Sequence, residues 1–553
     1  MRLPRRQPTY LQALRICAGR SFCAVLLVIG ADLPAAATTA PPVLDGDFRE
    51  WSDLAQGNVR VFCTADQVHL YIRLEGAVVL QAGSGVSVYI DADGDPATGL
   101  SRPPVGAEFR WDAGLRNGEA FTAAGEVART IRYTDLEWIS APVMDSSEFE
   151  ISMRRQDAMA TNCTVMVERN GVVLGVASAP YGNKTFERSV APARSAHADF
   201  RLMAYNVLAD DFLDEPDKKD RFMAEFALLQ PDIICFTEIY AHSAEDVRLR
   251  VAEALPYMTG ASGDGSWDSR IVSRYPIVFS QSLGLFGRSH AARVRSADGS
   301  VDQMVITSHL SCCSASGNRR TQLSDISAFI ARLRSGGLPG VPPDLPVILA
   351  GDLNLVRDDA ANFADFRNTA AIRPLRALHL DRNADYTWRN DSEPDGFSPG
   401  RLDYILSGEG IVALHAFVYK SANPPSDHLP VVADFAMDVD RNGLADRWER
   451  VFFGAIGRNG SADEDADGWR NLDEQRLGTD PVNPASSPQL RAGLTVDGPV
   501  LQFSGHGNGN VRFRLMRSSD LRTWVAAGRW IPGAEEIPAG GSGNFFYRAV
   551  LED

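Results

Sequence analysis

Polar residues interrupt or end apolar runs at six places between residues 198 and 437. They are Asn206, Glu238, His309, Asp352 with Asn354, Asp403, and Asp427 with His428. Burying such groups is costly unless they are paired or used. Carboxylates, amides and imidazoles together can hold a hard divalent cation, orient a phosphate and move protons. The set therefore predicts a site for metal-assisted hydrolysis.

Each of these residues also has an ordinary structural interpretation when it is taken alone. An Asp or Asn after a strand is commonly a turn or cap residue, and a single His is commonly structural. The combination of carboxylates, amides and imidazoles in one region is what favours a catalytic site. Neither a G-x-S-x-G nucleophile motif nor a G-x-x-x-x-G-K-[ST] phosphate loop occurs in this region. Attack by water is therefore the simpler expectation.

The apolar runs that carry these residues alternate with helical patterns. The strand-like runs are FRLMAYNVL, DIICFTEI, VDQMVITSHL, PVILAGDLNL and HLPVVADFAM. One helical stretch, RRTQLSDISAFIARL, places Leu323, Ile326, Phe329, Ile330 and Leu333 on one face. This alternation predicts an α/β region with polar residues at its strand ends.

The order of these motifs resembles the endonuclease/exonuclease/phosphatase superfamily over residues 198–437. In chain order the motifs are Asn206, QPDIICFTEI, SRYPI, TSHL, GDLN, LDYIL and SDHLPV. The resemblance implies a four-layered α/β sandwich, in which two mixed sheets pack face to face with helices outside. It also implies an active site at one edge, with Mg²⁺ or Mn²⁺ as the cofactor. Glu238 would be the main metal ligand, Asn206 beside it would contact metal or phosphate, and Asp427 would support the metal or the water.

The same resemblance implies catalytic roles for five residues. Asp352 would orient or deprotonate the attacking water, and Asn354 would bind a phosphate oxygen. His428 would face the phosphorus, with its tautomer and orientation set by Asp403. His309 would stabilise the phosphate and could protonate the leaving oxygen. In-line displacement by metal-assisted water is the implied mechanism.

Departures from family patterns narrow the branch. Val207 and Leu208 follow Asn206, where the abasic-site endonucleases keep an Asp two places after the Asn. The His of TSHL makes the chain more similar to the deoxyribonuclease I, sphingomyelinase and deadenylase-like branches. The inositol polyphosphate 5-phosphatases carry W-C-D-R before the late Asp strand, whereas this chain has GRLDYIL. That substrate class is therefore disfavoured.

Three function classes stay open on the sequence. The leading hypothesis is an extracellular nuclease or general phosphodiesterase, although a net charge of −16 weighs against a broad basic surface for nucleic acid. A sphingomyelinase-like or other phosphate-ester hydrolase is the alternative, but no exposed apolar hairpin for membrane contact stands out. The third is a non-catalytic surface or polysaccharide-binding protein, which retention of the whole residue set disfavours.

Residues 43–190 contain short alternating runs, which predict an antiparallel β-sandwich. The phrases LDGDFREW and DADGDPATGL resemble the family 9 type of sugar-binding module, so a polysaccharide partner is a hypothesis. Asp91, Asp93 and Asp95 either hold a structural cation or form a turn.

Residues 438–486 contain two acidic sets with oxygen-bearing side chains at positions 1, 3, 5, 9 and 12 and Gly at position 6. The sets are Asp438, Asp440, Asn442, Gly443, Asp446 and Glu449, and then Asp463, Asp465, Asp467, Gly468, Asn471 and Glu474. This spacing predicts structural Ca²⁺. The pair resembles the calcium repeats of thrombospondin type 3 and dockerin proteins, and we interpret it as a stiffened spacer, against an acidic linker as the alternative. Residues 490–553 predict a small β domain.

Residues 1–37 are typical of a secretory signal peptide. Arg2, Arg5 and Arg6 precede an apolar stretch, and Ala35–Ala37 offers a cleavage site. The apolar stretch is short for a membrane span, so we expect a secreted or periplasmic protein without a transmembrane segment. In that oxidising setting, Cys63 and Cys163 lie in strand-like runs and could form a bridge. Cys312 and Cys313 directly follow His309-Leu310-Ser311, and no C-x-x-C spacing occurs.

Overall fold

The protein is described by a computed structural model. It covers residues 57–141, 145–156, 161–182, 193–263, 268–284, 287–313, 315–355, 386–389, 399–421, 423–495, 498–504, 513–519, 522–530 and 543–551, with isolated stretches at 14–17, 23–29, 42, 44, 48, 51, 376–377 and 537–538. The chain divides into two compact units. One consists of Pro41–Arg441, and the other of Met1–Ala40 with Asn442–Asp553. Each unit is described by itself.

The first part of the Pro41–Arg441 unit is a two-sheet β structure, as the alternating runs predict. One sheet has the order β11 (Ile139–Ala141), β12 (Asp145–Arg154), β4 (Gln67–Val79), β3 (Val59–Cys63). The other has the order β10 (Val127–Ile131), β9 (Asn117–Phe121), β8 (Phe109–Asp112), β5 (Val86–Asp91), β13 (Asn162–Arg169), β14 (Val172–Pro180). Strands β6 (Leu100–Arg102) and β7 (Val105–Ala107) form a hairpin, and α1 spans Tyr133–Leu136. Leu70 and Phe149 from one sheet meet Val88 and Val165 from the other in a single apolar core.

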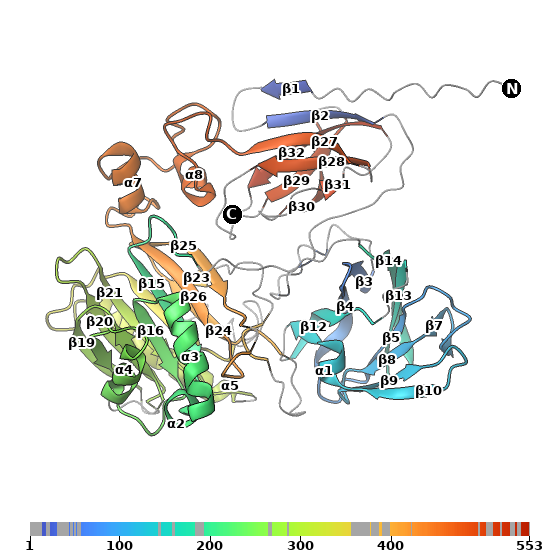
Figure 1. Ribbon diagram of the computed structural model, residues 1–553, viewed down its shortest axis with the longest axis horizontal. Coiled ribbons are helices and arrows are strands. Elements are labelled where there is room, and N and C mark those ends of the chain that lie inside the picture. The colour runs from blue at the N-terminus through green and yellow to red at the C-terminus, as the bar shows by residue number, and fades with distance from the viewer. Residues whose placement is uncertain are drawn as a thin grey trace. The chain divides into compact units, whose positions relative to one another are not determined.

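The later part of this unit contains two six-stranded mixed sheets. The first has the order β17 (Gly260–Ser262), β18 (Arg270–Ser273), β16 (Ile233–Thr237), β15 (Phe200–Asn206), β26 (Val431–Met437), β25 (Ile411–Val418). Its helices are α2 (Asp211–Asp214), α3 (Pro216–Leu229) and α4 (Ala244–Ala252) (Figure 1). Helix α3 starts with a proline, which costs no hydrogen bond there, and packs Phe222 and Phe226 against Tyr205 of β15 and Phe236 of β16.

The second sheet has the order β19 (Ile277–Leu283), β20 (Ser289–Arg295), β21 (Asp302–Ser308), β22 (Val347–Asp352), β24 (Asp403–Ser407), β23 (Arg376–Ala377). Helix α5 (Ser316–Arg334) packs on it. The apolar face predicted for this helix is confirmed, because Leu323, Ile326, Phe329, Ile330 and Leu333 are all buried. The five predicted strand runs are confirmed as β15, β16, β21, β22 and β26.

The two sheets share an apolar core. Ala204 and Val431 of the first sheet lie in one cluster with Val305 and Ile348 of the second. Strands β15 and β16 run parallel, as do β21 and β22. Parallel strands bring their carboxyl ends to the same edge of a sheet, so the residues at these ends can form one site.

The second unit contains α7 (Asp446–Phe453), α8 (Asn471–Leu477) and two small sheets. One sheet is β27 (Gln489–Thr495), β28 (Gly498–Ser504), β31 (Ile537–Pro538); the other is β1 (Leu14–Cys17), β2 (Cys23–Ile29), β32 (Gly543–Leu551), β29 (Phe513–Ser518), β30 (Val525–Trp530). Strands β1 and β2 fall inside the predicted signal peptide, whose removal stays a prediction. No helix within the described stretches is long and apolar enough to cross a membrane.

Candidate active site

Glu238 and Asn206 lie side by side after two parallel strands. Asn206 ends β15, and its Nδ2 donates to Glu238 Oε1 over 2.9 Å and to Asp352 Oδ2 over 3.2 Å. The amide oxygen of Asn206 accepts from the backbone of Leu208 over 3.1 Å. Glu238 Oε2 accepts from the backbone N–H of Ala209 over 3.0 Å. The backbone φ of Glu238 is 63°, in the left-handed region that non-glycine residues rarely adopt, and such strain commonly marks a functional position.

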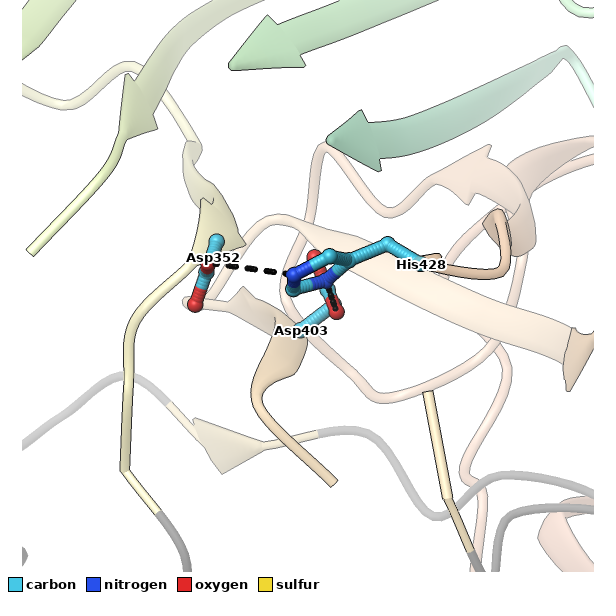
Figure 2. A group of neighbouring side chains, drawn as sticks. All are labelled: Asp352, Asp403 and His428. Atoms are coloured by element: carbon cyan, nitrogen blue, oxygen red, sulfur yellow. Dashed lines mark hydrogen bonds and ion pairs between the residues drawn. The ribbon is translucent and has the colours of Figure 1, made fainter. Parts of the chain in front are cut away.

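His428 and Asp403 form a buried hydrogen-bonded pair. His428 Nδ1 lies 2.7 Å from Asp403 Oδ2, and Figure 2 shows this pair beside Asp352. The side chain of Asp403 is fully buried. His428 Nε2 lies on the opposite side of the ring, 3.8 Å from Asp352 Oδ2. Burial opposes the charged imidazole, but Asp403 outweighs it and raises the pKa of His428 to about 10. Asp403 thus fixes which ring nitrogen faces the centre of the site.

Asp352 lies where the two imidazole rings converge. Its Oδ2 is 3.6 Å from His309 Nε2 and 3.8 Å from His428 Nε2. Its Oδ1 accepts from the backbone N–H of Asn354 over 3.0 Å. Burial, together with the charge of Asp403, raises the pKa of Asp352 to about 6. A carboxyl group with that pKa can exchange protons near neutral pH.

Asp268 belongs to this site although no sequence motif points to it. It is fully buried, and its Oδ2 lies 2.8 Å from His309 Nδ1. Arg288 Nη1 lies 3.7 Å from the same carboxylate oxygen. Burial opposes the charged form of His309, but the hydrogen bond to Asp268 and the charge of Asp352 outweigh it and raise the pKa of His309. The site therefore contains a second His–Asp pair.

Asn354 connects the site to the loop after β21. Its Nδ2 donates to the backbone carbonyl of Leu310 over 2.9 Å. The Leu310 N–H in turn donates to the carbonyl of Asp352 over 2.9 Å. One N–H of the Asn354 amide is thus used inside the protein, and only the other is open to a phosphate oxygen. Asn354 also has a positive φ, at 49°.

Asp427 lies at the rim of the site. Its Oδ2 accepts from Trp388 Nε1 over 3.1 Å, and its backbone carbonyl accepts from Arg389 over 2.8 Å. Its neighbour Ser426 donates to the Asn206 carbonyl over 2.8 Å and accepts from the His428 N–H, which fixes this loop against β15. Asp427 acts on His428 through its charge. The structure thus brings all the residues predicted for the site to one place.

The donor set fits a hard divalent cation. Ligand atoms of Asp352, Asp403 and His428 lie within 4.8 Å of one another, and buried Asp403 Oδ1 has no hydrogen-bond partner among the described residues. Asp403 and His428, however, are occupied by each other. Glu238 is only half-buried, with two oxygens facing Asn206 and Ala209. Because Mg²⁺ prefers oxygen ligands and keeps several waters, Glu238 is the better anchor.

A second acidic cluster lies in the β-sandwich. Ligand atoms of Asp91, Asp93 and Glu108 lie within 4.8 Å of one another, and Glu108 lies outside the DADGDPATGL run. Asp95 instead accepts from the backbone N–H of Ala97 over 3.0 Å. Asp91 accepts from Gly94, and both oxygens of Glu108 accept hydrogen bonds from Ala92 and Thr98. Both interpretations of this loop, cation site and turn, therefore stay open.

The second acidic set of the 438–486 segment forms a loop around unpaired oxygens. Asp463, Asp465 and Asp467 accept backbone N–H groups of Gly468, Asp467 and Trp469. Four buried oxygens of this acidic set have no partner among the described residues; they are Asp465 Oδ2, Asp467 Oδ2, Asn471 Oδ1 and Glu474 Oε2. Burial and the neighbouring carboxylates raise the pKa of Glu474 to about 8. A bound cation would relieve the repulsion between these carboxylates.

The first acidic set belongs to both units, with Asp438 and Asp440 in the Pro41–Arg441 unit and the residues from Asn442 onward in the other. Asn442 Nδ2 donates to Glu449 Oε1 over 3.0 Å, and the N–H groups of Gly457 and Arg458 donate to the same oxygen. Glu449 Oε2 is buried and has no partner within the described part of the chain. The ligand roles of Asp438, Asp440 and Asp446 stay predictions.

Residues 203–428 match the endonuclease/exonuclease/phosphatase family, and all the predicted site residues lie in this range. No curated protein matches the chain. Among solved structures, the human Nocturnin catalytic domain with bound sulfate is 16% identical, with 45% of this chain and 100% of that chain covered and a TM-score of 0.34. TDP2 of D. rerio with a single-strand DNA product is 21% identical, and the match covers 43% of this chain and 99% of that chain, with a TM-score of 0.34. Sphingomyelinase C of Streptomyces griseocarneus is 18% identical, and the match covers 42% of this chain and 98% of that chain, with a TM-score of 0.30.

Proposed function

We propose that the chain is a secreted, metal-dependent phosphodiester hydrolase in which water attacks the phosphorus. The observation that carries this proposal is the convergence of two His–Asp pairs on one carboxylate. His309 Nε2 and His428 Nε2 lie 3.6 and 3.8 Å from Asp352 Oδ2, and each ring is held by a buried Asp on its other side. Phosphodiester hydrolysis requires one group that removes a proton from the attacking water and another that donates a proton to the leaving oxygen. Two oriented imidazoles and one carboxyl group can supply both. The family match over residues 203–428 supports a phosphoesterase.

Glu238 would hold the cation, Mg²⁺ or Mn²⁺, with support from Asp427. When bound, the cation supplies positive charge that polarises a phosphoryl oxygen. Asn206 orients Glu238 through its 2.9 Å hydrogen bond and also reaches Asp352, so it fixes the spacing of these two carboxylates. Its backbone carbonyl is held by Ser426. Positioning of the anchor carboxylate therefore depends on strand β15 and on the loop that carries His428.

Asp352 acts as the general base toward water. Its pKa of about 6 lets it take a proton near neutral pH and release it again. His428 carries a positive charge at that pH and presents Nε2 to the phosphate, because Asp403 binds its Nδ1. His309 presents Nε2 from the other sheet and protonates the leaving oxygen. The second N–H of the Asn354 amide binds a phosphate oxygen.

A nuclease or general phosphodiesterase is the favoured substrate class, and a sphingomyelinase-like hydrolase is the alternative. The test is hydrolysis of plasmid DNA, RNA, sphingomyelin and bis-p-nitrophenyl phosphate by the purified protein, with Mg²⁺, Mn²⁺ or chelator. Metal-dependent cleavage of a nucleic acid that is lost in His428→Ala supports the nuclease assignment. Activity on sphingomyelin alone moves the assignment to the lipid phosphodiesterase. Failure on all four substrates overturns the enzyme assignment and favours a surface or polysaccharide-binding protein.

We further propose that the 463–474 loop binds structural Ca²⁺. Its support is the set of four buried, unpartnered oxygens on Asp465, Asp467, Asn471 and Glu474. Unpaired buried oxygens cost several kcal/mol unless a cation or hydrogen-bond donor satisfies them. Titration of the metal-free protein with calcium in a calorimeter tests whether this loop binds the ion. Equal heats in the wild type and in Glu474→Gln would contradict it.

A further inference from the structure

Two buried cysteines meet across the β-sandwich. Cys63 is the last residue of β3, and Cys163 is the second residue of β13, so they belong to opposite sheets. Their exposed fractions are 5% and 0%. Both are thiols in the structure, and both side chains belong to the single apolar core between the two sheets, where each shifts the pKa of the other. Each thiol therefore has the other as a neighbour at the interface of the sheets.

The surroundings favour a thiolate on Cys163. The contact with the Cys63 thiol lowers the pKa of Cys163 and outweighs burial, which raises it; the Tyr181 hydroxyl and the Arg155 guanidinium also lower this pKa, and the charge of Asp91 raises it. Arg155 lies over the Tyr181 ring at 3.8 Å from its centroid and donates to the Ala65 carbonyl over 3.1 Å. A thiolate is the form that attacks a disulfide, and in the folded sandwich these contacts favour that form on Cys163.

We propose that Cys63 and Cys163 form a disulfide that joins the two sheets of the sandwich. A low-molecular-weight disulfide such as oxidised glutathione supplies the oxidising equivalents. The thiolate of one cysteine attacks one glutathione sulfur, forms a mixed disulfide and releases one glutathione thiolate. The thiol of the other cysteine then loses its proton to solvent, attacks the protein sulfur of the mixed disulfide and releases the second glutathione. Two protein thiols are oxidised and one glutathione disulfide is reduced to two thiols.

Burial fixes when this reaction can occur. Neither sulfur is accessible to glutathione once the two sheets have closed, so the bond forms while the sandwich folds. For the same reason, the finished bond is shielded from reductants until the domain opens. The bond closes a loop that holds most of the sandwich, and a long closed loop restricts the unfolded chain strongly.

Cys235, Cys312 and Cys313 serve as internal comparisons. Cys235 is fully buried in β16, and burial raises the pKa of its thiol. Cys312 and Cys313 are exposed, with their sulfurs 2.7 Å apart. Adjacent Cα atoms are about 3.8 Å apart across a trans peptide, which is shorter than disulfide geometry prefers. We therefore expect the stable bond at the buried pair.

The first test maps the bond. The full chain is folded with oxidised glutathione, denatured in alkylating agent without reductant, and digested for mass spectrometry. The expected result is a linked peptide containing Cys63 and Cys163, with Cys235 alkylated. Dithiothreitol added to the native protein should leave this peptide intact, whereas dithiothreitol added in denaturant should split it. Alkylation of both Cys63 and Cys163 after oxidative folding, or a link to another cysteine, overturns the proposal.

A second test measures its stabilising effect. Protein folded with reductant should show a lower thermal midpoint for the sandwich than protein folded with oxidised glutathione. Cys63→Ala/Cys163→Ala should remove this difference, and the matched control Cys312→Ala/Cys313→Ala should keep it. A difference that persists in the first variant would overturn the proposal. Neither test uses hydrolysis, so its outcome is independent of the proposed activity.

Discussion

His428 Nδ1 lies 2.7 Å from Asp403 Oδ2, and this pair sets the charge of the imidazole that faces the centre of the site. Asp403 is the largest contribution that raises the pKa of His428 to about 10. Asp403→Asn keeps the shape and removes the charge, so the pKa of His428 should fall. NMR titration of the metal-free protein measures it. We expect hydrolysis to fall by about 10²- to 10⁴-fold, the range of general acid–base catalysis.

The control for this experiment is Asp298→Asn, because Asp298 lies in the exposed turn between β20 and β21. This variant should leave both the imidazole titration and the hydrolysis rate unchanged. An Asp403→Asn protein in which His428 still titrates near pH 10 would refute the role assigned to Asp403.

Asp268 should position His309 in the same way. Asp268→Asn removes the carboxylate 2.8 Å from His309 Nδ1, so the imidazole loses the partner that fixes its tautomer. We expect kcat to fall by about 10-fold or more with a smaller change in KM, since outer partners of catalytic groups commonly contribute that much. Steady-state kinetics with bis-p-nitrophenyl phosphate measures both parameters, and an unchanged kcat at every pH would contradict the assignment.

Glu238 should be required for metal binding but not for folding. Glu238→Ala opens no buried core, since the side chain is half-buried at the rim of the site. We expect hydrolysis to be lost and Mg²⁺ binding, measured by calorimetry, to weaken at least about 100-fold. The far-ultraviolet circular dichroism spectrum and the thermal midpoint should stay close to those of the wild type. Full activity of this variant would show that the metal is held elsewhere.

Calcium binding to the 463–474 loop should depend on pH through Glu474. The pKa of Glu474 is raised from 4.5 to about 8, so the metal-free folded loop keeps a proton that the unfolded chain has lost. Stability of the metal-free loop should therefore fall as pH rises from about 4.5 to about 8. Calcium competes with that proton, so the apparent affinity should rise over the same window.

Calorimetry at pH 6 and pH 8 tests this linkage. Tighter binding at pH 8 is the expected result, and Glu474→Gln should remove most of the difference. Chelation should loosen the 438–486 segment with little effect on hydrolysis when Mg²⁺ is supplied. A pH-independent affinity would contradict the role of Glu474, and loss of hydrolysis on removal of this calcium alone would contradict the spacer interpretation.

The sequence was informative where a polar residue breaks an apolar run. Asn206, Asp352 and Asp403 each end or begin a buried strand, so their burial signals a partner or a use. Asp268 carries no such signal, because it lies in the polar run GDGSWDSR and precedes β18. Only the packing of the two sheets shows that it meets His309. Glu108 was missed for a similar reason, since strand pairing between β5 and β8 brings it to Asp91 and Asp93.

The amide groups show another limit of sequence reasoning. Asn354 was predicted to bind a phosphate oxygen, yet one of its N–H groups donates to the Leu310 carbonyl. Asn206 directs its amide nitrogen toward Glu238 and Asp352, and its oxygen accepts from Leu208. Residue type alone does not specify which atom of an amide faces a site. That choice depends on the backbone groups that the fold brings to its other end.

The central claim is tested most directly by hydrolysis of bis-p-nitrophenyl phosphate, because this substrate contains a phosphodiester and neither a base nor a lipid. Wild type, Glu238→Ala, His428→Ala and the control Asp298→Asn are compared with Mg²⁺, Mn²⁺ or chelator. The account predicts release of p-nitrophenol that needs the cation, survives in Asp298→Asn and is lost in the other two variants. Hydrolysis that persists in chelator, or in His428→Ala, would contradict it.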